Sequence, residues 1–282
     1  MSAVPPQTRE LFTHHLVDIA SPGAVDKIVL QLRDTGLVTV EGITSRAVML
    51  DFVRQFMTIT WHRDSDTDGL TTVCASRREA LGAGFAGFSS GELAPHTDRS
   101  STPHPPRLMM FVNARPAATG GESLLYDGRA VHADLLAGAP DACTALSQPN
   151  TAYFGAGDGH TTQIFTPHPG HRVSMRLRMD EGRARFSPVI SPHLPQLHQA
   201  LVNSQWKLAL AEGQGYLVDN ARWLHGRRAF TGERLCWRAL GEPRFSLLPG
   251  FSTAHGTGAG PRDDLVSSQL LARHSSFGTV PR

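Results

Sequence analysis

The sequence predicts a mainly β protein with α-helices packed against the sheet, and three observations support this fold class. The apolar segments Leu37–Val40 and Arg107–Val112 have the length and composition of buried strands. Residues Val173–Asp180 alternate apolar and polar side chains, which is the period of a strand with one buried face. Between Ala24 and Thr35, by contrast, the apolar residues recur at helical spacing. We therefore expect the chain to open with α-elements that pack on a sheet.

Length and composition limit the class of protein. The chain has 282 residues, 40% of them apolar, and we expect one β-rich domain over residues 1–282 rather than two smaller ones. Its formal net charge of +2 does not indicate a nucleic-acid partner. Three widely spaced cysteines predict neither a disulfide framework nor a cysteine zinc site. The sequence shows no signal-peptide pattern and no run of about 18 apolar residues, so we expect a soluble cytoplasmic protein without a membrane partner.

Ahead of residue 91 the sequence predicts a second helix and a long loop. The helix is expected to begin at Thr44–Arg46, because the apolar residues up to Phe56 again recur at helical spacing. Residues 62–90 are charged and then glycine-rich, without a sustained period, which predicts a loop. The loop precedes a candidate metal ligand and contains two phenylalanines, so we expect it to cover an active site.

The second half of the chain predicts further strands, two helices and a tail. Strands are expected at Ser123–Tyr126, Gly215–Asp219 and Leu235–Leu240, and residues 116–121 should form a turn before the first of them. A helix is expected over Ala130–Leu136, and a longer one over His193–Leu210. After Phe251 the sequence shows no periodicity, so we expect residues 252–282 to form a flexible tail.

Two distant motifs supply candidate metal ligands. His96 and Asp98 lie two positions apart, and side chains at this spacing point to the same side of an extended segment. His225 is the natural third ligand. Two imidazoles and one carboxylate are the ligand set of non-haem iron(II) oxygenases. The simpler alternative is that His96 is a surface histidine and His225 a hydrogen-bonded core histidine.

Two arginines follow the second motif on an expected strand. Arg234 and Arg238 are four positions apart and would share one face of that strand. A guanidinium binds a carboxylate through two parallel hydrogen bonds, so an arginine near an iron site could hold a carboxylate-bearing cosubstrate. The alternative is a pair of solvated arginines on an edge strand.

Other motifs have simpler explanations. Residues Asp64–Gly69 match the first half of an EF-hand calcium loop, but Ala75 occupies the position of the bidentate glutamate. We therefore expect a solvated acidic loop. His132–Asp134 lies on an expected helix, where side chains two positions apart diverge. The signatures of serine hydrolases and of phosphate-binding loops do not occur.

Three sequence blocks, in this order, resemble the iron(II)- and 2-oxoglutarate-dependent dioxygenases that include taurine dioxygenase and clavaminate synthase. The blocks are Gly91–Asp98, Thr119–Gly128 and Asp219–Arg227, the last followed by Arg234 and Arg238. The resemblance implies a distorted double-stranded β-helix, a cupin-like jelly roll with helices packed outside.

The resemblance also implies roles for individual residues. It implies an iron(II) site with three ligands, His96, Asp98 and His225. Arg234 would pair with the distal carboxylate of 2-oxoglutarate, and Ser123 would donate its hydroxyl to the same cosubstrate, where family members usually have threonine. Arg238 would face the substrate or cosubstrate. Because the spacing after His225 varies in the family, the roles of the two arginines are interchangeable at this stage.

The expected protein is a non-haem oxygenase that uses Fe(II), 2-oxoglutarate and O2 and produces succinate and CO2. It would hydroxylate an unactivated C–H bond of a small polar metabolite, either amino acid-like or a natural-product intermediate. Arg176 and Arg178 favour a substrate that carries an acid, and Asp98 argues against halogenation, since related halogenases have a small residue there. Desaturation, cyclisation and a homo-oligomeric state remain open. The alternatives are a non-catalytic metal-binding jelly-roll protein and a metal-dependent hydrolase with the same ligands.

Overall fold

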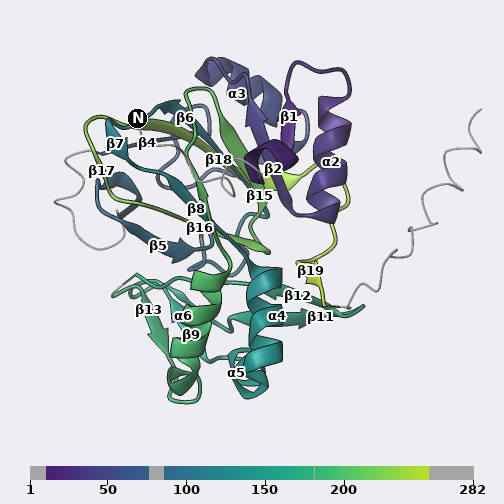
Figure 1. The fold of residues 1–282 in the computed structure, drawn as a ribbon, viewed down its shortest axis with the longest axis vertical. Coiled ribbons are helices and arrows are strands. Elements are labelled where there is room, and N and C mark those ends of the chain that lie inside the picture. The colour runs from purple at the N-terminus through teal and green to yellow at the C-terminus, as the bar shows by residue number, and fades with distance from the viewer. Residues whose placement is uncertain (1–10, 76–85, 181, 254–282) are drawn as a thin grey trace, which may run out of the picture.

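The largest sheet of the fold has seven strands and lies in the upper half of Figure 1. The structure is a computed structural model, and it describes residues 11–75, 86–180 and 182–253. Six strands follow the order β1-β2-β15-β6-β18-β3, and β4 pairs with β18 beside them. β1 and β2 are parallel, and the other pairs are antiparallel. The strands are β1 (Leu16–Asp18), β2 (Leu37–Glu41), β3 (Met57–Ile59), β4 (Thr71–Cys74), β6 (Leu108–Arg115), β15 (Gly215–Asp219) and β18 (Leu235–Pro243).

A four-stranded antiparallel sheet shares a hydrophobic core with this sheet. Its order is β14-β8-β16-β5, with β14 (Gln205–Leu208), β8 (Ser123–Asp127), β16 (Trp223–Arg227) and β5 (Leu93–His96). Met109 and Tyr216 of the larger sheet pack with Leu125 and Trp223 of the smaller one, all of them buried. This shared core holds the two sheets in fixed positions relative to each other.

Two helices share a second core with the larger sheet, separate from the one that joins the two sheets. They are α2 (Ala24–Asp34) and α3 (Arg46–Val53). Ile28 and Met49 on these helices pack against Val38 and Leu217 of the sheet. The start of α3 is fixed by Ser45, whose Oγ accepts a hydrogen bond from the backbone N–H of Val48 at 3.2 Å.

Three further helices pack on the smaller sheet, in the lower half of Figure 1. They are α4 (Gly128–Gly138), α5 (Pro140–Leu146) and α6 (Leu194–Asn203). Val131 and Leu197 of these helices share a core with Leu124 and Leu224 of the sheet. The same core takes in β9 (Ala152–Phe154), β11 (Phe165–His168), β12 (Arg172–Met175), β13 (Ala184–Phe186) and β19 (Phe251–Ser252). The remaining short elements are β10 (His160–Thr162), β7 (Thr119–Gly120), β17 (Phe230–Thr231) and the 3₁₀ turns Ala86–Phe88 and Ser191–His193.

The structure confirms a mainly β fold with helices but corrects the helix expected over His193–Leu210. Helix α6 ends at Asn203, and Gln205–Leu208 forms β14, which pairs with β8. The backbone groups along this side of β8 need hydrogen-bond partners, and β14 supplies them. The apolar residues of α6 and β14 therefore continue one helical spacing by chance, although they belong to two different elements.

Two other predictions were wrong in part. Within the segment 62–90, expected to be loop, Thr71–Cys74 forms β4 of the large sheet, and residues 76–85 lie outside the described residues. The strand expected over Val173–Asp180 ends at Met175. Beyond Met175, the backbone carbonyl of Leu177 accepts a hydrogen bond from the backbone N–H of Thr97. The residues after the strand therefore pair with the chain next to His96.

The helices predicted near Ala24–Thr35, from Thr44–Arg46 and over Ala130–Leu136 are confirmed with shifts of their ends, and the second of them stops at Val53 rather than near Phe56. No helix among the described residues is long and apolar enough to cross a membrane. Most of the expected tail, residues 254–282, lies outside the described residues.

Candidate metal centre

The structure brings His96, Asp98 and His225 together. His96 ends β5 and His225 lies in the middle of β16, and the two residues face each other across the antiparallel pair. Asp98 follows two positions after His96. One ligand atom from each residue lies within 4.8 Å of the others, and all three residues are buried. Such a buried cluster of two imidazoles and a carboxylate could hold a divalent metal ion.

The tautomer of His96 is suited to metal binding. Its Nδ1 lies 2.9 Å from the backbone carbonyl oxygen of Ala94. A carbonyl oxygen can only accept a hydrogen bond, so Nδ1 carries the hydrogen and Nε2 keeps its lone pair. A backbone carbonyl that fixes the ring in this way is typical of metal-bound histidines.

Asp98 provides an ionised carboxylate with one unsatisfied oxygen. Burial by itself would raise the pKa of Asp98, but the charge of Arg238 and the neighbouring imidazoles lower it to about 2. Its Oδ1 accepts a hydrogen bond from Nη1 of Arg238 at 2.8 Å. Its Oδ2 is buried, has no hydrogen-bond partner among the described residues, and lies 3.6 Å from Nε2 of His225. A buried carboxylate oxygen without a partner is costly, and a bound cation would remove that cost.

Both histidines favour the neutral form. Burial lowers the pKa of His225 to about 3, and repulsion from His96 adds to the effect. Burial also lowers the pKa of His96, although Asp98 opposes this shift. The ring centroids of the two imidazoles are 4.2 Å apart. At neutral pH the cluster therefore offers two neutral imidazoles and one carboxylate, a donor set that fits iron(II).

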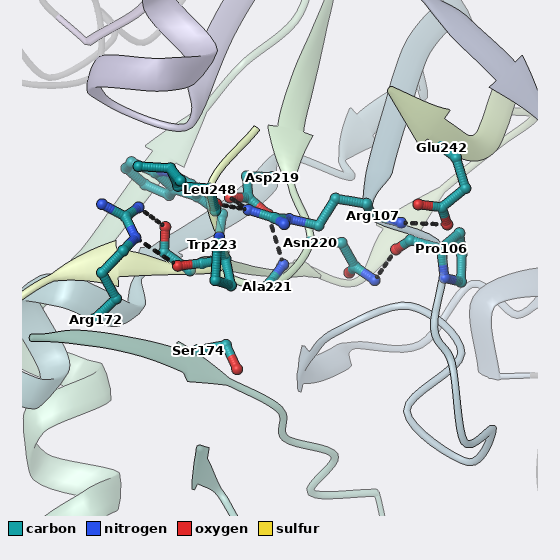
Figure 2. A network of polar contacts seen from close by, with 12 residues as sticks. Pro106, Arg107, Arg172, Ser174, Asp219, Asn220, Ala221, Trp223, Glu242 and Leu248 are labelled. Carbon is teal, nitrogen blue, oxygen red and sulfur yellow. Dashed lines mark hydrogen bonds and ion pairs between the residues drawn. The ribbon is translucent and has the colours of Figure 1, made fainter. Parts of the chain in front are cut away.

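Asn220, at the end of β15, clamps the backbone of Asp98. Its Oδ1 accepts a hydrogen bond from the N–H of Asp98 at 2.7 Å, and its Nδ2 donates to the carbonyl oxygen of Asp98 at 3.0 Å. The same Nδ2 donates to the carbonyl oxygen of Pro106 at 2.9 Å, a contact drawn in Figure 2. The candidate ligand is thus positioned through its own main chain.

Arg107 extends this network to the C-terminal part of the described chain (Figure 2). Its guanidinium makes two hydrogen bonds to the carboxylate of Asp219, at 2.6 and 2.8 Å. It also donates to the carbonyl oxygen of Leu248. Asp219 directly precedes Asn220, so the bidentate ion pair fixes the residue that holds Asp98. Sequence reasoning included Asp219 and Asn220 in a motif but assigned them no role.

A cavity of about 240 Å³ opens beside the three candidate ligands. Ser123, Arg234 and Arg238, the other residues named from the sequence, also line it. Ser123 is buried and hydrogen-bonds the Tyr216 hydroxyl, although burial still raises the pKa of Tyr216 above its usual range. The structure therefore gathers all six predicted site residues around one cavity.

The structure separates the two arginines that the sequence left interchangeable. Arg238 forms an ion pair with Asp98. Arg234 is only 5% exposed, and its guanidinium lies 5.4 Å from the ring centroid of Phe111 and 5.7 Å from that of Phe230. No carboxylate among the described residues pairs with Arg234. A buried cation that lines a cavity without a counter-ion indicates an anionic ligand.

The second arginine pair of the sequence, Arg176 and Arg178, does not share one surface. Arg178 lines the cavity and forms an ion pair with Asp180 at 2.5 Å. Arg176 lies outside the lining, and its guanidinium donates to the backbone carbonyl oxygens of Thr102 and Pro103 at 3.1 and 3.2 Å. The chain leaves the strand after Met175, which explains why the expected alternation does not place both side chains together.

The motifs that were set aside have structural partners. Arg46 donates to the carboxylates of Asp66 and Asp68 at 2.9 and 2.6 Å, so these acidic groups are partly compensated by an arginine and the expected solvated acidic loop is wrong in part. His132 on α4 packs edge-on against the ring of Phe165 on β11, at 5.0 Å between centroids. Neither motif contributes to the candidate metal centre.

Sequence reasoning missed several residues around the cavity. Arg99 lines it, directly after Asp98. His62 precedes Arg63 and Asp64, which line the cavity, and burial together with the charges of Arg238 and Arg99 lowers its pKa to about 4. Arg227 donates to the backbone carbonyl oxygens of residues 87, 89 and 91, which ties the end of the segment 62–90 to β16. The only available sequence signal was adjacency to the histidine motifs.

Comparison with known proteins identifies the family of the chain. The family model "Taurine catabolism dioxygenase TauD, TfdA family" matches residues 5–240. Dioxygenase str8 of Strobilurus tenacellus is 32% identical over 154 residues, which are 49% of this chain and 35% of that protein. Mitochondrial trimethyllysine dioxygenase of Gallus gallus is 28% identical over 173 residues, 54% of this chain and 41% of that protein. The chain thus matches less than half of the length of these curated relatives.

Solved structures show the same fold at low sequence identity. Asparagine oxygenase AsnO has a TM-score of 0.64 and 16% identity, with 81% of this chain and 79% of that chain covered. The non-haem iron oxygenase OrfP, in complex with Fe, succinate and (3S)-hydroxy-L-Arg, has a TM-score of 0.62 and 13% identity, with 84% and 85% covered. OrfP was also solved with Fe and α-ketoglutaric acid. The predicted family is confirmed: this chain belongs to the TauD, TfdA family of dioxygenases, which use iron(II), 2-oxoglutarate and O2.

Proposed function

We propose that the protein is an Fe(II)/2-oxoglutarate-dependent oxygenase that hydroxylates an unactivated C–H bond of a small polar, amino acid-like metabolite. We also propose that its two main sheets are the two layers of a distorted double-stranded β-helix. The observation that carries the proposal is the ionised, buried Asp98, whose free Oδ2 faces an imidazole beside a cavity that contains the unpaired Arg234.

In this proposal His96, Asp98 and His225 hold the iron. When bound, iron(II) with 2-oxoglutarate and O2 supplies the oxidation of the C–H bond, and 2-oxoglutarate is converted to succinate and CO2. The protein would offer three ligands, the Nε2 atoms of the two neutral imidazoles and the Oδ2 of Asp98. Arg238 keeps Asp98 ionised and occupies its other oxygen, Oδ1, with a hydrogen bond.

The cosubstrate site is assigned to Arg234 and Ser123. The distal carboxylate of 2-oxoglutarate would give the buried guanidinium of Arg234 the counter-ion that it lacks among the described residues. Aromatic rings of Phe111 and Phe230 flank this guanidinium and exclude water from it, which strengthens its attraction for an anion. The hydroxyl of Ser123 would add one hydrogen bond to the same ligand.

The proposed substrate class rests on the relatives and on the cavity. AsnO was solved with 2S,3S-3-hydroxyasparagine and OrfP with hydroxylated arginines, so both structures hold hydroxylated amino acids. In this chain the cavity of about 240 Å³ is lined by several charged groups, which suits a small polar molecule. The described flanks of the segment 62–90 also line it, through residues such as Asp64 and Phe88, and we propose that these flanks help to cover the bound substrate.

Asp98→Ala tests the proposal. The wild-type protein, loaded anaerobically with Fe(II) and 2-oxoglutarate, should show a weak visible charge-transfer band and should form succinate once O2 is admitted. Asp98→Ala should lose both, whereas Asp51→Ala, at an exposed position of α3, should keep both. Full succinate formation by Asp98→Ala would refute the assignment. A protein that binds metal but is indifferent to 2-oxoglutarate would be a non-catalytic metal protein, and turnover without O2 would indicate a hydrolase.

A further inference from the structure

The charges around the cavity do not balance. Among the described residues, seven arginines but only three aspartates line it. On the function proposed above, on which this inference rests, iron(II) and 2-oxoglutarate bring opposite charges of equal size and cancel each other. The cavity would therefore keep a positive surplus after both have bound. A surplus of positive charge around a partly enclosed cavity attracts an anion as the remaining ligand.

Most of these arginines already have partners. Arg238 pairs with Asp98, Arg178 pairs with Asp180, and Arg227 donates to backbone carbonyl oxygens. Arg99 differs from them. It is half-buried, it lines the cavity, and its guanidinium makes no hydrogen bond or ion pair with any described residue. Arg234 is likewise unpaired, but the proposed cosubstrate accounts for it.

The backbone of Arg99 is strained. Its φ of +56° lies in the left-handed region, which non-glycine residues adopt rarely and at a cost. Two hydrogen bonds from Thr102 to the carbonyl oxygen of Arg99, at 3.0 Å from N and 2.9 Å from Oγ1, hold this conformation. Arg176 in turn donates to the carbonyl oxygen of Thr102. Glycine or asparagine would adopt this conformation more easily, so the backbone conformation itself does not favour arginine at this position.

Arg99 and Arg234 occupy separate parts of the cavity wall. Arg99 directly follows Asp98, and Ser101 and Thr102 of the same segment also line the cavity. Arg234 lies instead against Gly121 and the rings of Phe111 and Phe230. We propose that Arg99 binds an oxyanion of the substrate, so that the substrate is an organic acid and Arg99 determines the specificity for it. The group is a carboxylate, sulfonate or phosphate.

The experiment uses the holoenzyme and compares acids with analogues in which a neutral amide replaces the carboxylate. The wild-type protein is loaded anaerobically with Fe(II) and 2-oxoglutarate, and the visible band is followed as each probe is added. The probes are the common L-amino acids, the corresponding L-amino acid amides, taurine and O-phospho-L-serine. We expect at least one acid to shift the band and its neutral analogue to bind at least about tenfold more weakly, the size of one charge-assisted hydrogen bond. The class of the acid that binds identifies the oxyanion.

Two variants assign the effect to Arg99. Arg99→Asn, which suits the left-handed backbone, should bind the selected acid at least about tenfold more weakly and bind 2-oxoglutarate as the wild type does. Arg99→Lys keeps the charge but not the planar fork of donors, so its affinity for the acid should lie between those of the wild type and Arg99→Asn. Arg115→Gln, an exposed arginine outside the cavity lining, is the matched control and should behave as wild type.

Several results would overturn the inference. An amide that binds as tightly as its acid, an acid that Arg99→Asn binds normally, or a panel in which no acid shifts the band would each refute it. Weaker 2-oxoglutarate binding by Arg99→Asn would place Arg99 in the cosubstrate site instead. In all these cases the wild-type band itself is present. Absence of that band would refute the proposed function, so the two failures are distinguishable.

Discussion

Asn220 makes no contact with the metal position that the candidate ligands define, yet it controls one ligand. It makes hydrogen bonds to both the N–H and the carbonyl oxygen of Asp98, and it also bonds Pro106. Asn220→Ala should therefore weaken metal binding by about 10- to 100-fold, as removal of outer-sphere partners typically does. Anaerobic titration with Fe(II), or with Mn(II) as a redox-stable substitute, measures this affinity.

The Asn220 prediction has a distinct negative outcome. Asn220→Asp keeps the acceptor for the N–H of Asp98 but loses the donor, so it should bind metal with intermediate affinity. A variant that melts at a lower temperature but binds metal as tightly as the wild type would show that Asn220 serves stability alone. The melting temperature and the metal affinity must therefore be measured on the same samples.

Arg234 is the residue on which cosubstrate binding should depend. Because its guanidinium is buried and unpaired among the described residues, loss of its charge-assisted hydrogen bonds should raise the KM for 2-oxoglutarate by about 10- to 100-fold. Arg234→Gln tests this, and Arg228→Gln, at an exposed position on the same segment, is its control. Equal KM values in the two variants would show that another group holds the cosubstrate.

At the scale of elements, Asp127 joins a strand, a helix and the second histidine motif. It ends β8, and its Oδ1 accepts a hydrogen bond from the N–H of Arg129 in the first turn of α4. Its two oxygens also accept hydrogen bonds from Nε and Nη2 of Arg222, at 2.9 and 2.8 Å. Arg222 lies just ahead of β16, which carries His225. The ion pair thus fixes the start of that strand.

Asp127→Ala should mainly lower stability. Removing one partner of a buried ion pair leaves the guanidinium of Arg222 uncompensated and costs about 3–5 kcal/mol, and loss of the helix cap adds to this. Urea unfolding measures the change, and Asp127→Asn, which can still cap α4, should lose less. Metal affinity in the folded variant should change little. A large fall in metal affinity with normal stability would contradict this assignment.

The elements also show how far sequence reasoning reaches. Short strands such as Gly215–Asp219 and the helix near Ala24–Thr35 were predictable because their periodicity is local and uninterrupted. The helix over His193–Leu210 was wrong in its second half because β14 forms only by pairing with β8, about 80 residues away in sequence. Propensity and spacing do not contain that information. The strand predicted over Val173–Asp180 was wrong beyond Met175 for the same reason, since Leu177 forms a hydrogen bond with the distant Thr97.

Some residues of the candidate site could be predicted from the sequence, and others could not. The ligand candidates His96, Asp98 and His225 were predictable from residue type, spacing and family resemblance, and the structure brings them together. Arg99 and Asn220 were not, because their roles depend on a left-handed backbone and on hydrogen bonds across more than 100 positions. The sequence also could not distinguish Arg234 from Arg238, since the difference lies in the ion pair of Arg238 with Asp98 and in the aromatic rings around Arg234.

At the scale of the whole molecule, the two main sheets and their helices act as a scaffold that holds charged groups inside the protein. His96 and His225 come from the smaller sheet and Arg238 from the larger one, so the cluster is assembled from both layers. A buried ionised Asp98 with one free oxygen lowers the stability of the metal-free protein. Metal binding to the folded state alone should therefore raise the free energy of unfolding of the whole molecule.

This coupling gives a test that does not depend on turnover. With Mn(II) at about 100 times its dissociation constant, the free energy of unfolding should rise by about 2.7 kcal/mol, provided that the unfolded chain does not bind the ion. Thermal unfolding with and without Mn(II) measures the change. Asp98→Ala should remove most of the stabilisation, whereas Asp51→Ala on the surface of α3 should retain it. If Mn(II) stabilised Asp98→Ala as much as the wild type, the ion would bind elsewhere, because without Asp98 the site has only two neutral imidazoles to offer.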